Sequence, residues 1–376
     1  MTNLQKTPPF PLIHIAGKPF ERGISYGRQA GDRIATGLAI YREAFGVAGV
    51  EWHEAMIYAE RFCQQVRAYD PDMYVEIEGI AKGSEQPVEA IVALNARTEI
   101  IFWRDNELDP IKNIANAAMQ EECTAALALP SATRDGHVLH GQNWDWNPRC
   151  ADSAIVLRIE NDDGPDILTF VEAGQLARHG MNSDGVALTV NGLQCDLDCG
   201  YVGVPNPLIR RRLLQSPTLA GAIDAVLNTR ISFSHSLILS HTAGVAVNLE
   251  ATPEENFWIQ PEDGILVHAN HFKCPVARGK ITDVGLQRCP ESLYRDQILL
   301  DHMQAHRGQI TIETLKEGFA NKFGAPDAIL RSPKARPGGN LSGTVATLIM
   351  DTTAQKMWLA PRPYLDIDFT EYSLSA

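Results

Sequence analysis

Hydrophobic residues recur at helical spacing through the first hundred residues of the chain. A short strand is expected at residues 12–16, closed by Gly17. Within the following stretch, Gly23, Gly27 and Gly31 repeat at every fourth position, which predicts a small helix face against which another element packs closely. Four helical segments are expected in this part of the chain, at residues 20–45, 51–69, 73–82 and 87–102.

From Cys123 onward the pattern changes to short apolar runs typical of strands. Helical spacing returns at 208–228, where Pro217 interrupts it, and at 291–305 and 311–323. Strands grouped in this way, with helices before, between and after them, predict an α+β protein with layered packing. The least regular segments are 103–122 and 332–340. Strands are expected at 124–130, 137–143, 154–159, 167–171, 186–191, 236–240, 245–250, 257–260, 265–268, 344–350 and 356–360.

Residues 121–148, EECTAALALPSATRDGHVLHGQNWDWNP, carry a hairpin signal. Two apolar runs flank a polar loop that contains Asp135-Gly136, a pair typical of hairpin turns. Cys123 begins the first strand and Asp145 ends the second. Since these ends lie side by side in an antiparallel pair, a thiol and a carboxylate are expected to approach one another.

Composition excludes several classes of partner. The chain has 376 residues, of which 44% are hydrophobic, enough for a large core. It carries 33 basic and 46 acidic residues, a net charge of −13, so neither nucleic acid nor an anionic membrane surface is an expected partner. The sequence shows no signal peptide and no run near 18 apolar residues, which favours a cytoplasmic protein.

The seven cysteines do not suggest a disulfide framework, because their number is odd and their spacing irregular. Cys195 and Cys199 form a C-x3-C pair, but no second ligand pair lies nearby, so reduced thiols are favoured over a structural metal. No metal and no cofactor is therefore expected.

Four residues together supply the groups needed for nucleophilic catalysis. Cys123 alone would be read as a small buried hydrophobe. Asp145 lies in GQNWDW, Asn270 in HANH after a strand-like run, and Arg331 after the apolar AIL. Individually the three have ordinary interpretations: a turn cap, a turn residue and a solvated charge. Together with the cysteine they provide a nucleophile, a carboxylate, an amide that can donate to an oxyanion, and a cation.

The order of these motifs resembles the acyl-coenzyme A:6-aminopenicillanic acid acyltransferase family. The resemblance runs from GKPFERGISYG to near the C-terminus, with Cys-Thr, GQNWDW, HANH, Arg-Ser-Pro and TVATLIMD in order. Its members are isopenicillin-N-acyltransferase-like, peptidase C45-like N-terminal-nucleophile (Ntn) hydrolases. The resemblance implies a four-layer αββα sandwich. It also implies a precursor that cuts its Glu122–Cys123 bond to give a heterodimer of 1–122, mostly helical, and 123–376, rich in strands, as one interlocked unit.

The resemblance also assigns roles within the site. Cys123 would be the nucleophile, Asp145 and Arg331 its supporting carboxylate and guanidinium, and Asn270 the oxyanion amide. This chain departs from the family pattern in having Glu122 where the best-known member has glycine, and Leu330 where that member has a hydroxyl. Arg336 is therefore an alternative to Arg331.

The chemistry follows from the position of the thiol. Cleavage gives Cys123 an α-amine with a pKa of about 7.7–8, suited to act as general base near neutral pH. A substrate acyl group would then form a thioester on the cysteine, and water or an amine would remove it.

Further substrate contacts are expected from Trp144, Asn191, and Gly180 with Met181 in GMNSDG, a segment for which an ordinary hairpin turn is an equal alternative. His268 and His271 suggest a metal pair less strongly than a loop. The Arg210–Arg212 run could attract a coenzyme A phosphate, although a solvated helix face is favoured.

Three functions stay open at this point. One is acyl transfer from a small acylated substrate, an amide or a thioester such as an acyl-coenzyme A. The second is plain hydrolysis of an N-acyl amino acid or β-alanyl amide. The third is an unprocessed, non-catalytic homologue that binds an acylated ligand. Further association of the heterodimer into homo-oligomers is also open.

Overall fold

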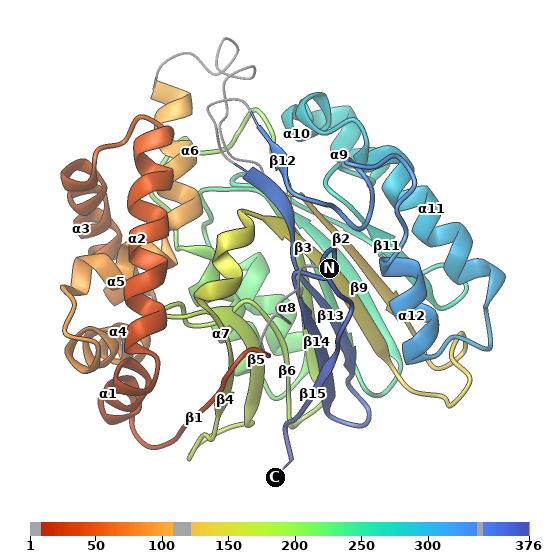
Figure 1. Ribbon diagram of the computed structural model, residues 1–376, viewed down its shortest axis with the longest axis horizontal. Helices are drawn as coiled ribbons and strands as arrows, with labels where there is room; N and C mark the ends of the chain where they lie inside the picture. Colours follow the sequence, from red (N-terminus) through yellow and green to blue (C-terminus); the bar gives the residue numbers. More distant parts are fainter. Residues whose placement is uncertain (1–8, 108–121, 337–340, 376) are drawn as a thin grey trace, which may run out of the picture.

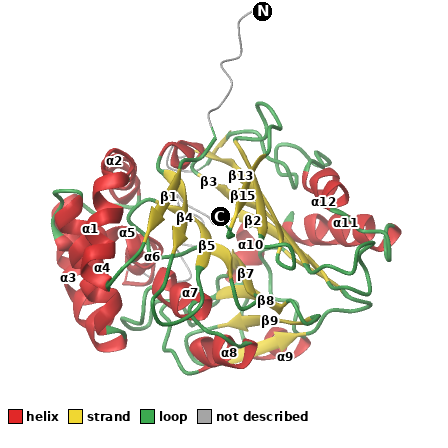
Figure 2. Cartoon of the chain, turned by 90° about the horizontal axis from the view of Figure 1, so that it is seen from below, coloured by secondary structure: helices red, strands yellow, loops and turns green. Residues whose placement is uncertain are grey.

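The structure is a computed structural model that describes residues 9–107, 122–336 and 341–375. Two sheets stack face to face, and helices cover both outer sides (Figure 1). The N-terminal helices lie on one side, and α11 and α12 lie on the other (Figure 2). The expected α+β, four-layer αββα arrangement is confirmed.

The first sheet has eight strands and receives its edge strand from the N-terminal part of the chain. β1 pairs in parallel with β4, and the other neighbours in this sheet are antiparallel. In spatial order the strands are β1 (Leu12–Ile15), β4 (Ala154–Ile159), β5 (Ile167–Glu172), β6 (His179–Asn182), β7 (Val186–Gly192), β8 (His235–His241), β9 (Val245–Ala251) and β10 (Asn256–Ile259).

The second sheet contains the expected hairpin at its centre. β2 and β3 pair antiparallel, and Gly136 in the connecting turn has φ +71°, a conformation that favours glycine. The short β12 (Lys334–Ala335) pairs with β13. In spatial order the main strands are β11 (Ile265–His268), β2 (Glu122–Ala128), β3 (Leu139–Trp146), β13 (Leu341–Asp351), β14 (Lys356–Pro361) and β15 (Thr370–Ser373).

The helices form the two outer layers. The outer face of the first sheet is covered by α7 (Asn206–Leu214) and α8 (Leu219–Leu227), and that of the second by α11 (Ser292–Ala305) and α12 (Ile312–Phe319). In residues 9–107, 122–336 and 341–375, no helix is both long and apolar enough to cross a membrane. The other helices are α1 (Pro19–Gln29), α2 (Gly31–Val47), α3 (Trp52–Tyr69), α4 (Pro71–Gly83), α5 (Val88–Asn95), α6 (Arg97–Glu107), α9 (Pro275–Lys280), α10 (Val284–Arg288) and the 3-10 helix η2 (Pro148–Asp152).

Alternation along β2 decides which side chains face which layer. Ala125 and Leu127 pack with Ile238 of β8 between the two sheets. Ala126 and Ala128 pack instead in a cluster formed with α11 and α12. Because successive strand residues point to opposite faces, odd-numbered positions of β2 face the other sheet and even-numbered positions face the helices.

Two of the three glycines in the repeat, Gly23 and Gly27, let α1 pack closely against α4, as expected. A Cβ on Gly23 would lie 2.2 Å from the carbonyl oxygen of Glu76, and one on Gly27 would lie 2.3 Å from that of Ile80. Nothing lies within 4 Å of the corresponding point at Gly31, so its predicted packing role is wrong.

Most expected elements are present, with shifted ends. The single helix expected at 20–45 is two helices that break at Ala30, and the one at 87–102 breaks at Ala96. The sequence pattern missed β6, β12 and β15 and the short helices α9 and α10. The loop expected at 103–122 is helical to Glu107 and strand at Glu122, and its middle lies outside the described residues.

Candidate active site

Cys123 is fully buried at the second residue of β2, and its backbone is held on both sides. The Cys123 amide donates to Asn270 Oδ1 at 2.7 Å. Its carbonyl oxygen accepts from Arg295 Nη1, also at 2.7 Å. Two predicted site residues, Cys123 and Asn270, are therefore in direct contact through the backbone nitrogen that self-cleavage would release.

The hairpin brings Cys123 and Asp145 to adjoining positions, but on opposite faces of the sheet. Glu122 pairs with Asp145, and Cys123 pairs with Trp144. Directly opposed residues in an antiparallel pair share a face, so Cys123 and Trp144 face the other sheet, and Glu122 and Asp145 face the α11 side. The strand ends lie together as expected, but the register is offset by one residue, so the thiol and the carboxylate do not share a face of the sheet in the uncut chain.

Arg331 forms the centre of a buried charge cluster on the α11 side. Its Nη1 donates to Glu122 Oε2 at 2.6 Å, and its Nη2 donates to Glu291 Oε1 at 2.9 Å. Its Nε lies 3.2 Å from Asp145 Oδ2. Asp145 Oδ1 also accepts from the Thr344 hydroxyl at 2.6 Å. The predicted pairing of Asp145 with Arg331 is present, and Glu122 belongs to the same cluster.

The two carboxylates paired across the hairpin have pKa values shifted in opposite directions. Burial raises the pKa of Asp145 to about 7, although Arg331 and Thr344 act against it. Burial also acts to raise the pKa of Glu122, but the surrounding guanidiniums, Arg331 first, outweigh it and hold that pKa below its ordinary value. The surroundings therefore favour the ionised form of Glu122, whereas Asp145 gains or loses a proton near neutral pH.

The raised pKa of Asp145 predicts that the free energy of unfolding depends on pH through this residue. The carboxyl of an unfolded Asp has a pKa of about 3.9, whereas burial raises it to about 7 in the folded chain. Between about pH 4 and 7 only the folded chain keeps this proton, so its contribution to stability falls as pH rises. Urea unfolding of the uncut Cys123→Ala chain, with and without Asp145→Asn, should show a smaller loss of stability with rising pH when Asp145 is replaced. Identical pH profiles would contradict the raised pKa.

The Glu122 side chain is enclosed by donors. Besides Arg331, its carboxylate accepts from Arg336 and from the Ser342 hydroxyl at 2.9 Å. The Cys289 thiol donates to Glu122 Oε1 at 3.2 Å. Arg336, the alternative considered for Arg331, therefore contacts the residue before Cys123, while Arg331 bridges that residue and Asp145.

Hydrogen bonds on both sides of its amide group orient the Asn270 side chain. Its Oδ1 accepts from the Cys123 amide and from Arg295 Nη2 at 3.0 Å. Its Nδ2 donates to the carbonyl oxygen of Gly192 at 2.9 Å. In the uncut chain the amide oxygen thus faces Cys123, whereas the predicted oxyanion role uses the Nδ2 group.

Arg295 is the main site residue that the sequence interpretation missed. It lies on α11, is fully buried, and donates to Thr124 Oγ1 at 2.8 Å in addition to its contacts with Cys123 and Asn270. Burial lowers its pKa. Arg295 occupies the same helix face as Leu299 and Met303, both buried. A charged residue in line with Leu299 and Met303 on the helix was the available signal.

Of the predicted substrate contacts, Trp144 lies beside Cys123, whereas Asn191 bonds to the backbone before Asn270. Trp144 lies beside Cys123 on the intersheet face; the Arg178 guanidinium sits 4.1 Å from its ring centroid. Its indole Nε1 is buried without a hydrogen bond to any described residue. Asn191 instead has a structural position, because its Nδ2 donates to the carbonyl oxygens of His268 and Ala269, just before Asn270.

Gly180 and Met181 lie within β6, inside the eight-stranded sheet. A Cβ on Gly180 would lie 2.3 Å from the Leu168 carbonyl oxygen, and Met181 belongs to the main hydrophobic core. GMNSDG therefore forms the ordinary hairpin that was one of its two interpretations, with Gly185 at φ +95° in the turn.

The remaining polar motifs have structural partners. His268 Nε2 lies 2.9 Å from Glu250 Oε1, and His271 Nδ1 lies 2.7 Å from Ser292 Oγ, so the two rings have separate partners. In the arginine run, Arg210 and Arg211 are buried, and Arg211 pairs with Glu76. The expected solvated helix face is therefore wrong for these two residues, because α7 packs them against the N-terminal helices.

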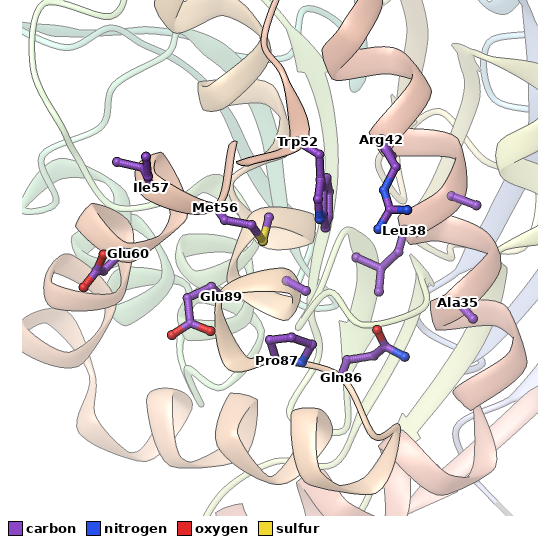
Figure 3. A pocket seen from close by; sticks show the side chains of 12 residues that line it. Ala35, Leu38, Arg42, Trp52, Met56, Ile57, Glu60, Gln86, Pro87 and Glu89 are labelled. Atoms are coloured by element: carbon purple, nitrogen blue, oxygen red, sulfur yellow. The ribbon is translucent and has the colours of Figure 1, made fainter. Parts of the chain in front are cut away.

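A cavity among the N-terminal helices lies apart from this site. A cavity of about 540 Å³ opens among α2, α3 and the start of α5, and its walls include Arg42, Trp52 and Glu89 (Figure 3). None of the predicted site residues lines it. A void of about 10 Å³, close to the space one water needs, adjoins Asn270, Cys289 and Gly192.

Comparison with known proteins shows the family of the chain. The chain matches the family described as acyl-coenzyme A:6-aminopenicillanic acid acyl-transferase over residues 132–362, more than half of its length. It is 28% identical to the acyl-coenzyme A:6-aminopenicillanic-acid-acyltransferase 40 kDa form of Emericella nidulans over 352 residues, which are 92% of this chain and 91% of the relative. The family match begins after Cys123, whereas the match to the relative is long enough to include it.

Solved structures with related folds give weaker matches. A variant of conjugated bile acid hydrolase from Clostridium perfringens is 14% identical, with a TM-score of 0.48, over 66% of this chain and 92% of its own. An N-acylethanolamine-hydrolyzing acid amidase orthologue from Caenorhabditis elegans is 13% identical, with a TM-score of 0.41, over 61% of this chain and 93% of its own. On the family match, the chain belongs to the acyl-coenzyme A:6-aminopenicillanic acid acyltransferase family and is an enzyme that transfers acyl groups or hydrolyses amides.

Proposed function

We propose that this enzyme activates itself by cutting the Glu122–Cys123 bond and then acts through an acyl thioester on Cys123. The observation that supports the proposal is that two hydrogen bonds fix the backbone of Cys123 at the start of β2. Asn270 holds the nitrogen of the bond to be cut, and Arg295 holds the next carbonyl oxygen. On the other side of the bond, Arg331 and Arg336 hold the Glu122 side chain.

Self-cleavage needs no other reactant than water. The Cys123 sulfur attacks the Glu122 carbonyl carbon, the C–N bond breaks, and the thiol proton ends on the departing nitrogen, which becomes the α-amine of Cys123. Water then hydrolyses the thioester and leaves a free Glu122 carboxylate and a free thiol. Asn270 Oδ1 already accepts a hydrogen bond from this nitrogen, so it keeps the new amine in place.

Cleavage also removes the constraint that separates the thiol from Asp145. As an interior residue of β2, Cys123 has a direction fixed by strand pairing on both sides. As a terminal residue it is free to rotate about its remaining bonds. The α-amine, with a pKa near 8, then acts as general base, and the proposed oxyanion donor is Asn270 Nδ2, which turns from Gly192 toward the substrate.

The two fragments are proposed to remain together as a heterodimer of 1–122 and 123–376. β1 pairs with β4, which lies beyond the cleavage point. The main hydrophobic core contains residues of both pieces, among them Phe45, Ile91, Phe170 and Leu188. Neither piece would bury this surface alone, so dissociation would expose much of the core.

The substrate is proposed to be a small amide or thioester, of which an acyl-coenzyme A is one form. To test this, the processed enzyme is mixed with an N-acyl amide or an acyl thioester and quenched in acid. The account predicts an acyl adduct on the peptide that begins at Cys123. A non-catalytic binding protein would give ligand binding without an adduct, and that result would contradict the proposal.

Hydrolysis and transfer are separated by the same assay with a competing amine. A new amide formed at the expense of free acid would indicate transfer, and unchanged acid production would indicate plain hydrolysis. Hydrolysis and transfer both pass through the same thioester on Cys123. The assay therefore shows whether water or the amine accepts the acyl group.

A further inference from the structure

The cavity among the N-terminal helices has apolar walls and is large enough for a small ligand. Its volume of about 540 Å³ falls within the range of about 300–1,000 Å³ that is typical of small-molecule sites. The walls come from three helices: Leu38 from α2, Trp52, Met56 and Ile57 from α3, and Ala90 from α5. Ile57 is exposed, and Trp52 and Met56 are half-buried. An apolar hollow that faces water favours a ligand with an apolar body.

The charges around this cavity are divided between two sides. Arg42 lies on the α2 side, where its guanidinium sits 4.7 Å from the centroid of the Trp52 ring. Glu60 of α3 and Glu89 of α5 lie on the other side (Figure 3). Burial raises the pKa of the half-buried Cys63 thiol to about 11, and the negative charges of Glu89 and Glu60 add to this shift. The two carboxylates therefore lie near one thiol, at the same end of the cavity.

These two carboxylates are not neutralised within the described chain. In residues 9–107, 122–336 and 341–375, the side chains of Glu60 and Glu89 form no ion pair and accept no hydrogen bond. Arg42, the cation of the cavity wall, lies over the Trp52 ring instead. A cation that enters the cavity near Glu60 and Glu89 would gain two opposite charges without displacing an existing partner.

We propose that this cavity binds a small monoamine, an ammonium group on an apolar body, at a site separate from Cys123. The ammonium group pairs with Glu60 and Glu89, and the apolar body lies between the α2 and α3 walls. Arg42 at the other end disfavours a second positive charge, so a diamine fits less well. An enzyme that hydrolyses amides releases amines, so ligands of this class arise at the enzyme itself. The inference does not depend on self-cleavage, because every residue that lines the cavity lies between Ala35 and Ala90.

The test is calorimetry of the purified wild-type chain with three probes of similar shape: phenylbutylamine, phenylbutanol and phenylbutyrate. The amine should bind with the lowest Kd and phenylbutyrate with the highest, because Glu60 and Glu89 attract the first and repel the last. Replacing both, Glu60→Gln with Glu89→Gln, should raise the Kd of the amine by roughly 5- to 20-fold, as expected for the loss of two partly exposed ion pairs. The Kd of phenylbutanol should stay unchanged.

Three further variants complete the comparison. Glu254→Gln is the matched control, because Glu254 is an exposed carboxylate between β9 and β10, and it should leave the Kd of the amine unchanged. Ala39→Phe should weaken the binding of the amine and of phenylbutanol alike. Ala39 is exposed on α2 and lines the cavity, so the larger ring occupies the cavity without entering the core. Cys123→Ala should bind the amine as the wild type does.

Equal affinity for the three probes, or an amine affinity unchanged both in the double glutamine variant and in Ala39→Phe, would overturn the site. Loss of amine binding in Cys123→Ala would place the amine at the nucleophile and would overturn it as well. Light scattering decides whether a second copy of the chain covers the cavity instead: a dimer that Ala39→Phe separates would exclude the small amine. None of these readouts needs turnover, so the site and the proposed function fail separately.

Discussion

Cys123→Ala is expected to yield an uncut chain of 41.3 kDa that transfers and hydrolyses no acyl group. Alanine lacks the sulfur proposed to attack both Glu122 and the substrate, so cleavage and turnover should fail together. Removing a catalytic nucleophile typically lowers kcat by more than about 10³-fold. Activity against the best N-acyl amide and the mass of the purified chain are measured on the same sample.

The matched control is Cys274→Ala, which removes another buried thiol from a position preceding α9. It should process and turn over substrate, with at most a loss of stability from the smaller side chain. If Cys123→Ala still gave two fragments or kept most of its activity, another nucleophile would have to be sought.

Arg331→Leu is expected to produce the largest loss of stability among single substitutions at the site. The substitution leaves Asp145 and Glu291, and in part Glu122, buried without their shared cation. Removing one partner of a buried ion pair typically costs about 3–5 kcal/mol. Urea unfolding is measured in the Cys123→Ala background, so that both samples are single chains.

Arg307→Leu serves as the control for this comparison. Its side chain is half exposed, and exposed ion pairs contribute about 0–1 kcal/mol. If Arg331→Leu lowered the free energy of unfolding by no more than Arg307→Leu, the buried cluster would not have the importance assigned to it here.

The hairpin was predictable because its signals are local. Alternating apolar residues and an Asp-Gly turn identify β2 and β3, and this alone brings Cys123 beside the strand that carries Asp145. The faces were not predictable from the same pattern. A shift of one residue in register exchanges the faces, and here it places the thiol and the carboxylate on opposite sides.

Contacts between distant segments account for the other differences. Arg295 meets Cys123 only because α11 packs over β2, and Glu122 meets Arg336 only because the segment before β13 returns to the same place. The GMNSDG segment was expected either to let a substrate approach its glycines or to form a hairpin turn, and the strand β6 within it was not expected. Its neighbours β5 and β7 instead supply strand partners that short-range propensity does not reveal.

The structure shows specific side-chain partners for Glu122, the residue before Cys123. In the sequence, Glu122 was a departure from the glycine of the family pattern. In the fold its carboxylate has three hydrogen-bonded side-chain partners besides Arg331, which hold the residue before Cys123 in place.

The most direct test of the account is the intact mass of the purified wild-type chain under denaturing conditions. The account predicts two species, one that ends at Glu122 and one that begins at Cys123, in equal amounts. A single species of 41.3 kDa, stable on prolonged incubation, would contradict it. The α-amine that serves as general base would then be absent, and an unprocessed protein that binds an acylated ligand would become the better description.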